Sequence, residues 1–185
     1  MKFSAFIEKN LELILADWDA SAEKMLPAAA KMSPSQLRDH AREVLLAIAR
    51  DMETRQAEEQ RAAKSQGERA PATGPQSAAS THGASRLTAG FDLVQLVHEF
   101  RALRASVLKF WSEADVAGAA KPAAEEIARF HEALDQALAE SVERYSAESA
   151  KSRDIFLAVL GHDVRGPLSG IRLAADALLT PSLPD

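Results

Sequence analysis

Large apolar residues recur at steps of three and four positions along most of this chain, the spacing that places them on one face of an α-helix. The first stripe ends near Pro27 and predicts one amphipathic helix. Its members are Phe3, Phe6, Ile7, Leu11, Ile14, Trp18, Ala22 and Met25. A second helix is predicted after Ser33, a good N-cap, with Pro34 at its first position and Gln36 completing a capping box. Its stripe is Leu37, Ala41, Val44, Leu45, Ile48 and Met52, after which the apolar face is lost.

The second half of the chain repeats this pattern after an interruption. Residues 65–81 combine Gly, Pro, Ser and Ala without periodicity, which predicts a mobile loop within a domain. A short turn of helix is expected from His82 to Thr88, and a strong helix follows Gly90 with the stripe Leu93, Leu96, Val97, Phe100, Leu103, Val107 and Trp111. Pro122 opens a last helix, whose stripe is Ile127, Phe130, Leu134, Leu138, Val142 and Tyr145.

The amino-acid composition is consistent with an all-helical fold and excludes several kinds of site and partner. Hydrophobic residues make up 46% of the 185 positions, but many are alanine and only 5% of the chain is aromatic, so the predicted fold class is all-α. The absence of cysteine excludes disulfides and thiolate metal sites. The net charge of -5, with dispersed cations, argues against nucleic acid. Because no apolar run approaches about 20 residues and charges interrupt the amino end, we expect a cytoplasmic protein without membrane contact.

Near the carboxyl end of the sequence, a further helical stretch presents a histidine away from its apolar stripe. The stripe is Leu157, Leu160, Val164, Leu168, Ile171, Ala175 and Leu178, and His162 falls nearly opposite it at about 100° per residue. Asp163 could accept a hydrogen bond from one ring nitrogen and leave the other nucleophilic toward phosphorus. Pro167 removes the partner of the Asp163 carbonyl, which predicts a local bend. Taken alone, an exposed histidine is usually an ordinary surface residue.

Taken together, these residues resemble the H-box of the dimerisation and phosphoacceptor domain of sensor histidine kinases. The similar stretch is FLAVLGHDVRGPLSGI, from Phe156 to Ile171, and it departs from the family at Gly166, where Thr or Asn is commoner. The resemblance covers Ser152 to about Leu179. It implies that His162 is phosphorylated, that Asp163 is the base and orienting acid, and that Arg165 and Pro167 shape the site.

In that family the histidine helix turns back into a second helix, dimerises as a four-helix bundle and precedes an ATP-binding domain. The eight glycines of this chain form no phosphate-cradling loop, so no cofactor is expected in it, and ATP and Mg belong to a parent kinase. Residues 149–185 are therefore expected to be the truncated first helix of the phosphoacceptor domain. The implied partners are a second copy through the His162 helix, the parent's ATP-binding domain and a response regulator receiver domain.

The stretch from His82 to Trp111 resembles the RsbRD-type amino-terminal sensor domain of stress-signalling proteins and some cytoplasmic histidine kinases. The residues that carry this likeness are His82, Arg86, Gly90, Phe91 and the run from Glu99 to Arg104. The similarity spans about residues 10–148 and implies an all-helical input domain over residues 1–148, for which a globin-like bundle is one option. It implies no particular ligand.

Two further residues are candidates for ligand binding, beside His82 and Arg86. Arg104 projects into its apolar stripe, and a buried guanidinium needs a carboxylate, carbonyls or an anionic ligand. His131 falls in the stripe of the last helix. An internal structural contact is the favoured alternative for both. His98, opposite its stripe, and His40, at an edge, are expected to be solvated. A haem site gets little support, because His98 points away from the core and His131 alone is a thin basis for an axial ligand.

Three functions remain open at this stage. The leading one is a histidine kinase input domain that controls His162; the others are a non-catalytic stress-signalling interaction module and a ligand-binding sensor without phosphotransfer. The stripe of the last input helix and the His162 stripe are out of phase by roughly 80° across residues 146–153. We interpret this segment as a transmission joint, the alternative being a helix that changes packing partners.

Overall fold

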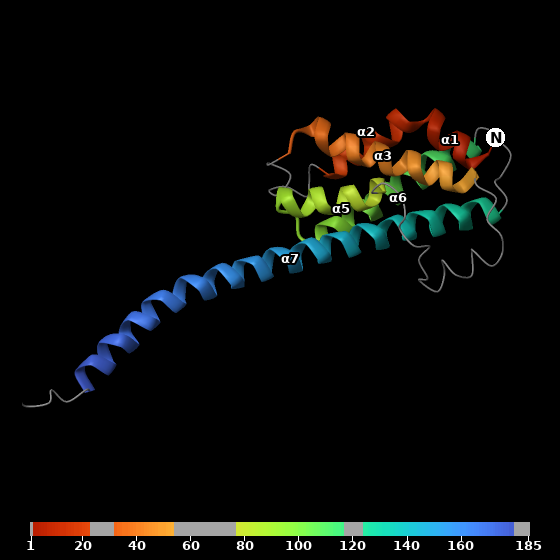
Figure 1. Ribbon diagram of the computed structural model, residues 1–185. Helices are drawn as coiled ribbons and strands as arrows, with labels where there is room; N and C mark the ends of the chain where they lie inside the picture. Colours follow the sequence, from red (N-terminus) through yellow and green to blue (C-terminus); the bar gives the residue numbers. More distant parts are fainter. Residues whose placement is uncertain (1, 23–31, 54–76, 117–123, 180–185) are drawn as a thin grey trace, which may run out of the picture. The chain divides into compact units, whose positions relative to one another are not determined.

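The computed structural model of the chain describes residues 2–22, 32–53, 77–116 and 124–179 (Figure 1). The regular structure in these segments is helical: α1 (Phe3–Lys9), α2 (Leu11–Ala22), α3 (Pro34–Glu53), α5 (Ala78–Ala89), α6 (Leu93–Val116) and α7 (Ala124–Leu179). The predicted all-α class is confirmed. Contacts divide the chain into two compact units, residues 1–146 and 147–185. No helix in the described segments is long and apolar enough to cross a membrane.

The helix ends follow from local hydrogen bonds. At the start of α3 the Ser33 amide donates to Gln36 Oε1 at 2.9 Å and the Gln36 amide donates to Ser33 Oγ at 3.2 Å, so the predicted capping box is confirmed. The predicted single first helix is wrong. It is divided at Asn10, whose side-chain amide donates to the Phe6 carbonyl at 2.9 Å. Asparagine competes for helical carbonyls in this way, and the break leaves the apolar stripe intact.

Helix α5 is longer than the predicted turn. It begins after Ser77, whose hydroxyl accepts the Ser80 amide at 3.0 Å, and ends at Gly90, which has the left-handed φ of 87° that favours glycine. The predicted loop 65–81 is therefore wrong for residues 78–81, and its residues 65–76 lie outside the described segments. The apolar pattern of the sequence did not predict the full length of this helix, because its inward residues are small or charged.

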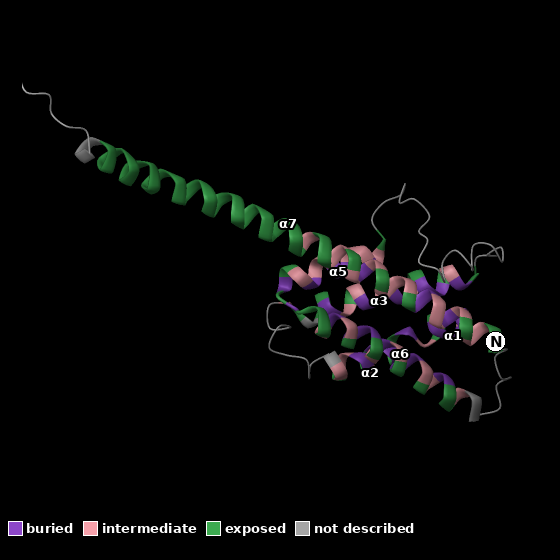
Figure 2. Ribbon diagram, turned by 90° about the horizontal axis from the view of Figure 1, so that it is seen from below, coloured by how far each residue is buried: buried purple, intermediate pink, exposed green. Residues whose placement is uncertain are grey.

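The stripes predicted from the sequence meet in the core of the first unit, where the buried positions of Figure 2 lie. Helix α2 packs on α6, and α3 packs on α1 and α5. At one end of the core, the rings of Phe3 and Phe6 each lie 4.7 Å from the Trp111 ring, and Phe3 lies 5.1 Å from Phe130 of α7. Edge-on and tilted ring contacts of this kind add to the stability given by apolar burial.

The amino-terminal part of α7 is held against α5 at very short range. A Cβ atom built on Gly83 of α5 would lie 2.1 Å from the carbonyl oxygen of Ser141. The Ser141 hydroxyl donates to the Ala79 carbonyl at 2.6 Å, and Tyr145 donates to the Phe91 carbonyl at 2.9 Å. Only glycine at position 83 permits this approach.

The second unit is a helical stretch within α7, and the ribbon in Figure 2 is coloured as exposed over residues 149–176. Its helix continues through Pro167 without interruption. The exposed apolar residues include Leu157, Leu160, Val164, Leu168 and Ile171, with 45% to 66% of each accessible.

Candidate functional site

His162 lies on the second unit with its side chain 85% exposed. Its Nδ1 is 3.3 Å from Oδ1 of Asp163, which is itself 71% exposed. Nδ1 is therefore the ring nitrogen that engages the carboxylate, and no described residue bonds to Nε2. An exposed contact of this length stabilises the fold little. Its effect is to orient the ring and favour the tautomer with the proton on Nδ1.

The helix surface beside His162 is hollow and basic. A shallow groove is lined by Gly161, Val164, Arg165, Leu168, Ser169 and Arg172. The small residues Gly161 and Ser169 leave room between the longer side chains, and two arginines lie along the groove. Pro167 is exposed near it. The two guanidinium groups that line the groove can attract an anion such as a phosphoryl group.

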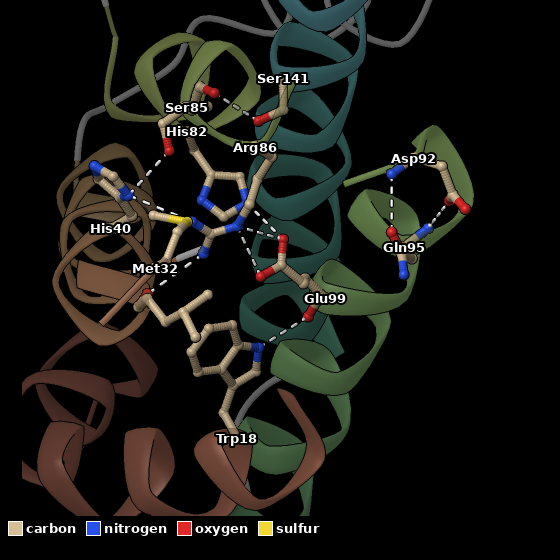
Figure 3. Close-up of polar contacts among 12 residues, drawn as sticks. Trp18, Met32, His40, His82, Ser85, Arg86, Asp92, Gln95, Glu99 and Ser141 are labelled. Carbon is tan, nitrogen blue, oxygen red and sulfur yellow. Dashed lines mark hydrogen bonds and ion pairs between the residues drawn. The ribbon is translucent and has the colours of Figure 1, made fainter. Parts of the chain in front are cut away.

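The first unit contains a buried charge cluster, which we define as His82, Arg86, Glu99 and His40 (Figure 3). Arg86 of α5 is fully buried, and its Nε donates to both carboxylate oxygens of Glu99 on α6 at 2.8 Å. His82 is 3% exposed, and its Nε2 lies 3.2 Å from Glu99 Oε2. Neither ring nitrogen of His82 makes a hydrogen bond to a described residue, so the approach of Nε2 to Glu99 is an ion-pair contact. The Glu99 carboxylate thus contacts two side chains of α5, Arg86 and His82.

His40 on α3 also contacts this cluster, so the prediction that it is solvated is wrong. Its Nδ1 lies 3.2 Å from the Ser85 hydroxyl and 3.4 Å from Nη1 of Arg86. Arg86 Nη2 donates to the Leu37 carbonyl at 3.4 Å. Because α3 packs against α5, a residue at the edge of its apolar stripe becomes half-buried. His98, by contrast, is exposed as predicted.

The pKa shifts within the cluster follow from burial and charge. Burial lowers the pKa of His82 below 6.5, and the Arg86 charge adds to this, whereas contact with Glu99 opposes it. Burial alone would raise the pKa of Glu99, but contact with His82 and Arg86 outweighs it and lowers that pKa below 4.5. Burial, followed by Arg86, also lowers the pKa of His40. At neutral pH the cluster therefore holds one cation, one anion and two neutral rings.

Arg104 does not occupy the buried position predicted for it. Its side chain is 35% exposed and pairs with Asp135 of α7, although its Nε is buried. The inward face of α6 is turned toward Glu99 and Ser106, which are both buried, and away from the side where Arg104 and the 38% exposed Leu93 lie. His131 on α7 is half-buried, and its Nε2 has no hydrogen-bond partner in the described part of the chain.

Glu99 is the site residue that sequence reasoning missed as a candidate. It lies within the run quoted for the sensor resemblance, but on the flank of the apolar stripe of α6. Its partners His82 and Arg86 are one turn apart on α5, and that spacing of two basic side chains on an otherwise inward face was the available signal.

A small cavity adjoins the cluster. It measures about 10 Å³, the scale of one water molecule, and is lined by Trp18, Ala41, Val44, His82, Glu99, Phe100 and Leu103. The Trp18 indole donates to the Glu99 carbonyl at 3.1 Å, which ties α2 to the same place. The cavity cannot hold a haem. The described residues also contain no group of three or more His, Asp or Glu side chains placed to hold a metal ion.

Comparison with known proteins gives no match: no family model fits the chain, and no curated protein or solved structure is similar to it. The two family resemblances rest on the quoted residues.

Proposed function

We propose that this chain is the input and phosphoacceptor part of a cytoplasmic sensor histidine kinase, in which the first unit controls phosphorylation of His162. The observation that carries the proposal is the combination of residues around His162. An exposed imidazole has an adjacent carboxylate at Nδ1, and it lies within the H-box pattern that ends in Arg165 and Pro167. The basic groove beside it supports the same function.

The chemistry at His162 follows from its tautomer. With the proton on Nδ1 and Asp163 accepting it, the lone pair of Nε2 is free to attack phosphorus. The N–P bond forms as the P–O bond to the donor breaks, and that electron pair leaves with the donor oxygen. Asp163 stabilises the positive charge on the ring, or takes its Nδ1 proton. A response regulator receiver domain would then accept the phosphoryl group. The donor nucleotide is bound by the parent's kinase domain.

The exposed stripe on the second unit supports a homodimer. Leu157, Leu160, Val164, Leu168 and Ile171 are each about half exposed or more, which is unfavourable in water for a continuous apolar face. We propose that two copies pair in parallel through this stripe, as in the kinase family. Light scattering at tens of micromolar, where modest interfaces associate, should give a dimer, and a monomer would contradict this part of the proposal.

The direct test uses the parent kinase with labelled ATP. His162→Gln should abolish an acid-labile phosphoryl label, whereas His98→Gln, which changes another exposed histidine, should retain it. Asp163→Asn should slow labelling, because the amide cannot take the Nδ1 proton. The present chain with ATP alone should remain unlabelled. Full labelling of His162→Gln, or labelling of this chain without a kinase domain, would refute the proposal.

The exposed apolar stripe also favours a second candidate, a non-catalytic interaction module that dimerises through α7. It predicts a dimer that His162→Gln leaves intact, with no phosphoryl label in any variant. The labelling experiment therefore separates the two functions.

A further inference from the structure

The buried charge cluster has an unusual charge balance. Among the described residues, Glu99 is the carboxylate in contact with His82, and Arg86 already engages both of its oxygens at 2.8 Å. Neither ring nitrogen of His82 has a hydrogen-bond partner among the described residues, so a protonated ring would hold a buried N–H without an acceptor. Protonation would create a second buried cation beside Arg86, and the described residues packed around it supply no second carboxylate to compensate it.

The helices around His82 bring few other titratable groups toward it. From α3 comes His40, with ring centroids 6.3 Å apart, and from α6 come Glu99 and the Phe100 ring at 5.4 Å. Helix α2 contributes Trp18 to the shared cavity, and α7 contributes the neutral Ser141 against α5. Asp39 and Glu43 of α3 act on His40 and favour its protonation. Acid therefore adds positive charge at two rings that face the same guanidinium.

Helix α5 connects this cluster to α7. His82 and Arg86 flank Gly83, whose missing side chain allows the Ser141 backbone to approach, and Ser141 bonds to the Ala79 carbonyl one turn earlier. Any displacement of α5 that relieves a charged His82 also breaks this contact with α7. We propose that the buried charge cluster is an acid-sensitive latch, in which protonation of His82 releases α5 from α3, α6 and α7.

Through this latch the first unit would respond to a fall in pH. Its effect on His162 phosphorylation rests on the proposed function, because α7 carries both Ser141 and His162. The release of α5 from its neighbouring helices does not depend on the proposed function.

The thermodynamic linkage between His82 protonation and opening fixes the size and sign of the expected pH effect. The pKa of His82 is lowered in the folded state, so the open state takes up a proton that the closed state does not. Opening therefore becomes about tenfold more favourable for each pH unit below 6.5, until the closed state also protonates. Stability contributed by neutral His82 is fully present above pH 6.5 and is lost as pH falls.

Hydrogen exchange of α5 amides, corrected for intrinsic rates, tests this on the whole chain. The wild type should lose about tenfold protection per pH unit below 6.5, and His98→Asn should behave identically. His82→Phe keeps a ring against Phe100 but cannot protonate, and its α5 protection should be flat until carboxylates titrate. His40→Asn should retain the response. Equal pH dependence in the wild type and His82→Phe, or loss of the response in His40→Asn, would overturn the assignment to His82.

Side-chain NMR of the wild type keeps the proposal testable if His82→Phe does not fold. The His82 ring signal should titrate together with the loss of α5 protection. A His82 ring that protonates while α5 stays protected would refute the latch. A failed latch leaves the His162 proposal intact, and an unlabelled His162 leaves the latch intact.

Discussion

Gly83→Ala is the substitution for which the structure and local propensity make opposite predictions. Gly83 lies inside α5, where alanine is the better helix former by roughly 0.5–1 kcal/mol. Propensity alone therefore predicts a more stable protein. The packing predicts the reverse, because a Cβ at this position would lie 2.1 Å from Ser141 O and 2.8 Å from its carbonyl carbon.

The size of the stability loss follows from how far α5 and α7 must separate. Ordinary van der Waals contact begins at 3.4 Å, so α5 and α7 must separate by roughly 1 Å to admit the methyl group. Overpacking of this kind costs about 1–3 kcal/mol. Weakening the 2.6 Å bond from Ser141 to the Ala79 carbonyl costs about 1 kcal/mol more. After the gain in helix propensity, we expect a net loss of about 1–3 kcal/mol, which lowers the melting temperature by about 2–10 °C.

Fluorescence-detected urea and thermal unfolding measure this loss, since Trp18 and Trp111 are both buried in the first unit. Gly161→Ala is the matched control, because nothing lies within 4 Å of its added Cβ, and it should leave these transitions unchanged. Ser141→Gly should not rescue Gly83→Ala, since the clashing atoms belong to the backbone. A stabilised Gly83→Ala protein, or a rescue by Ser141→Gly, would refute the close approach of α5 and α7.

Other substitutions test the charges and the long helix. Glu99→Gln leaves the buried Arg86 without a counter-charge and should cost about 3–5 kcal/mol in urea unfolding. Arg104→Ala breaks a partly exposed pair and should cost less than about 1 kcal/mol in the same assay; equal losses would contradict the assigned burial. If the proposed function holds, one residue inserted between Ser149 and Ser152 of the proposed parent kinase should rotate His162 by about 100° relative to the input unit and sharply change autophosphorylation. A seven-residue insertion should nearly restore it, and equal activities would exclude a transmission joint.

Helices with large apolar stripes were the predictable part of the fold. Leu37, Val44 and Ile48 of α3 were assigned inward by spacing alone, and all three are buried. The cap at Ser33 was predictable because its hydrogen bonds reach only three residues along the chain. The break at Asn10 was not, since the apolar spacing continues across it and a competing side-chain bond decides the geometry.

The pattern around His162 and the buried charge cluster differ in how far apart their residues lie along the chain. The His162 pattern is local: its histidine, acid and proline lie within six residues, so their types and order alone suggest the resemblance to the H-box. Arg86 and Glu99 are 13 residues apart on different helices. Their contact depends on how α5 and α6 are rotated about their own axes, which no single helical pattern specifies.

The rotation of α6 shows why the apolar stripe was an incomplete guide. A stripe marks the side of a helix that avoids water, but a charged residue can share that side when a partner on another helix compensates it. Arg86 provides this partner for Glu99, and α6 turns to bury Glu99 and Ser106 while Arg104 reaches Asp135 at the surface.

Helix α5 obeys the same period of three and four, but with small and charged residues in place of large apolar ones. Its buried residues are Ala79, His82, Gly83, Arg86 and Ala89. The small members bring neighbouring helices close enough to exclude water, and this exclusion makes the contact between Arg86 and Glu99 strong. Gly83→Ala should therefore act on the charges as well as on packing. By admitting water between α5 and α7, it should reduce the cost of Glu99→Gln, so that the double variant loses less stability than the two single losses added together.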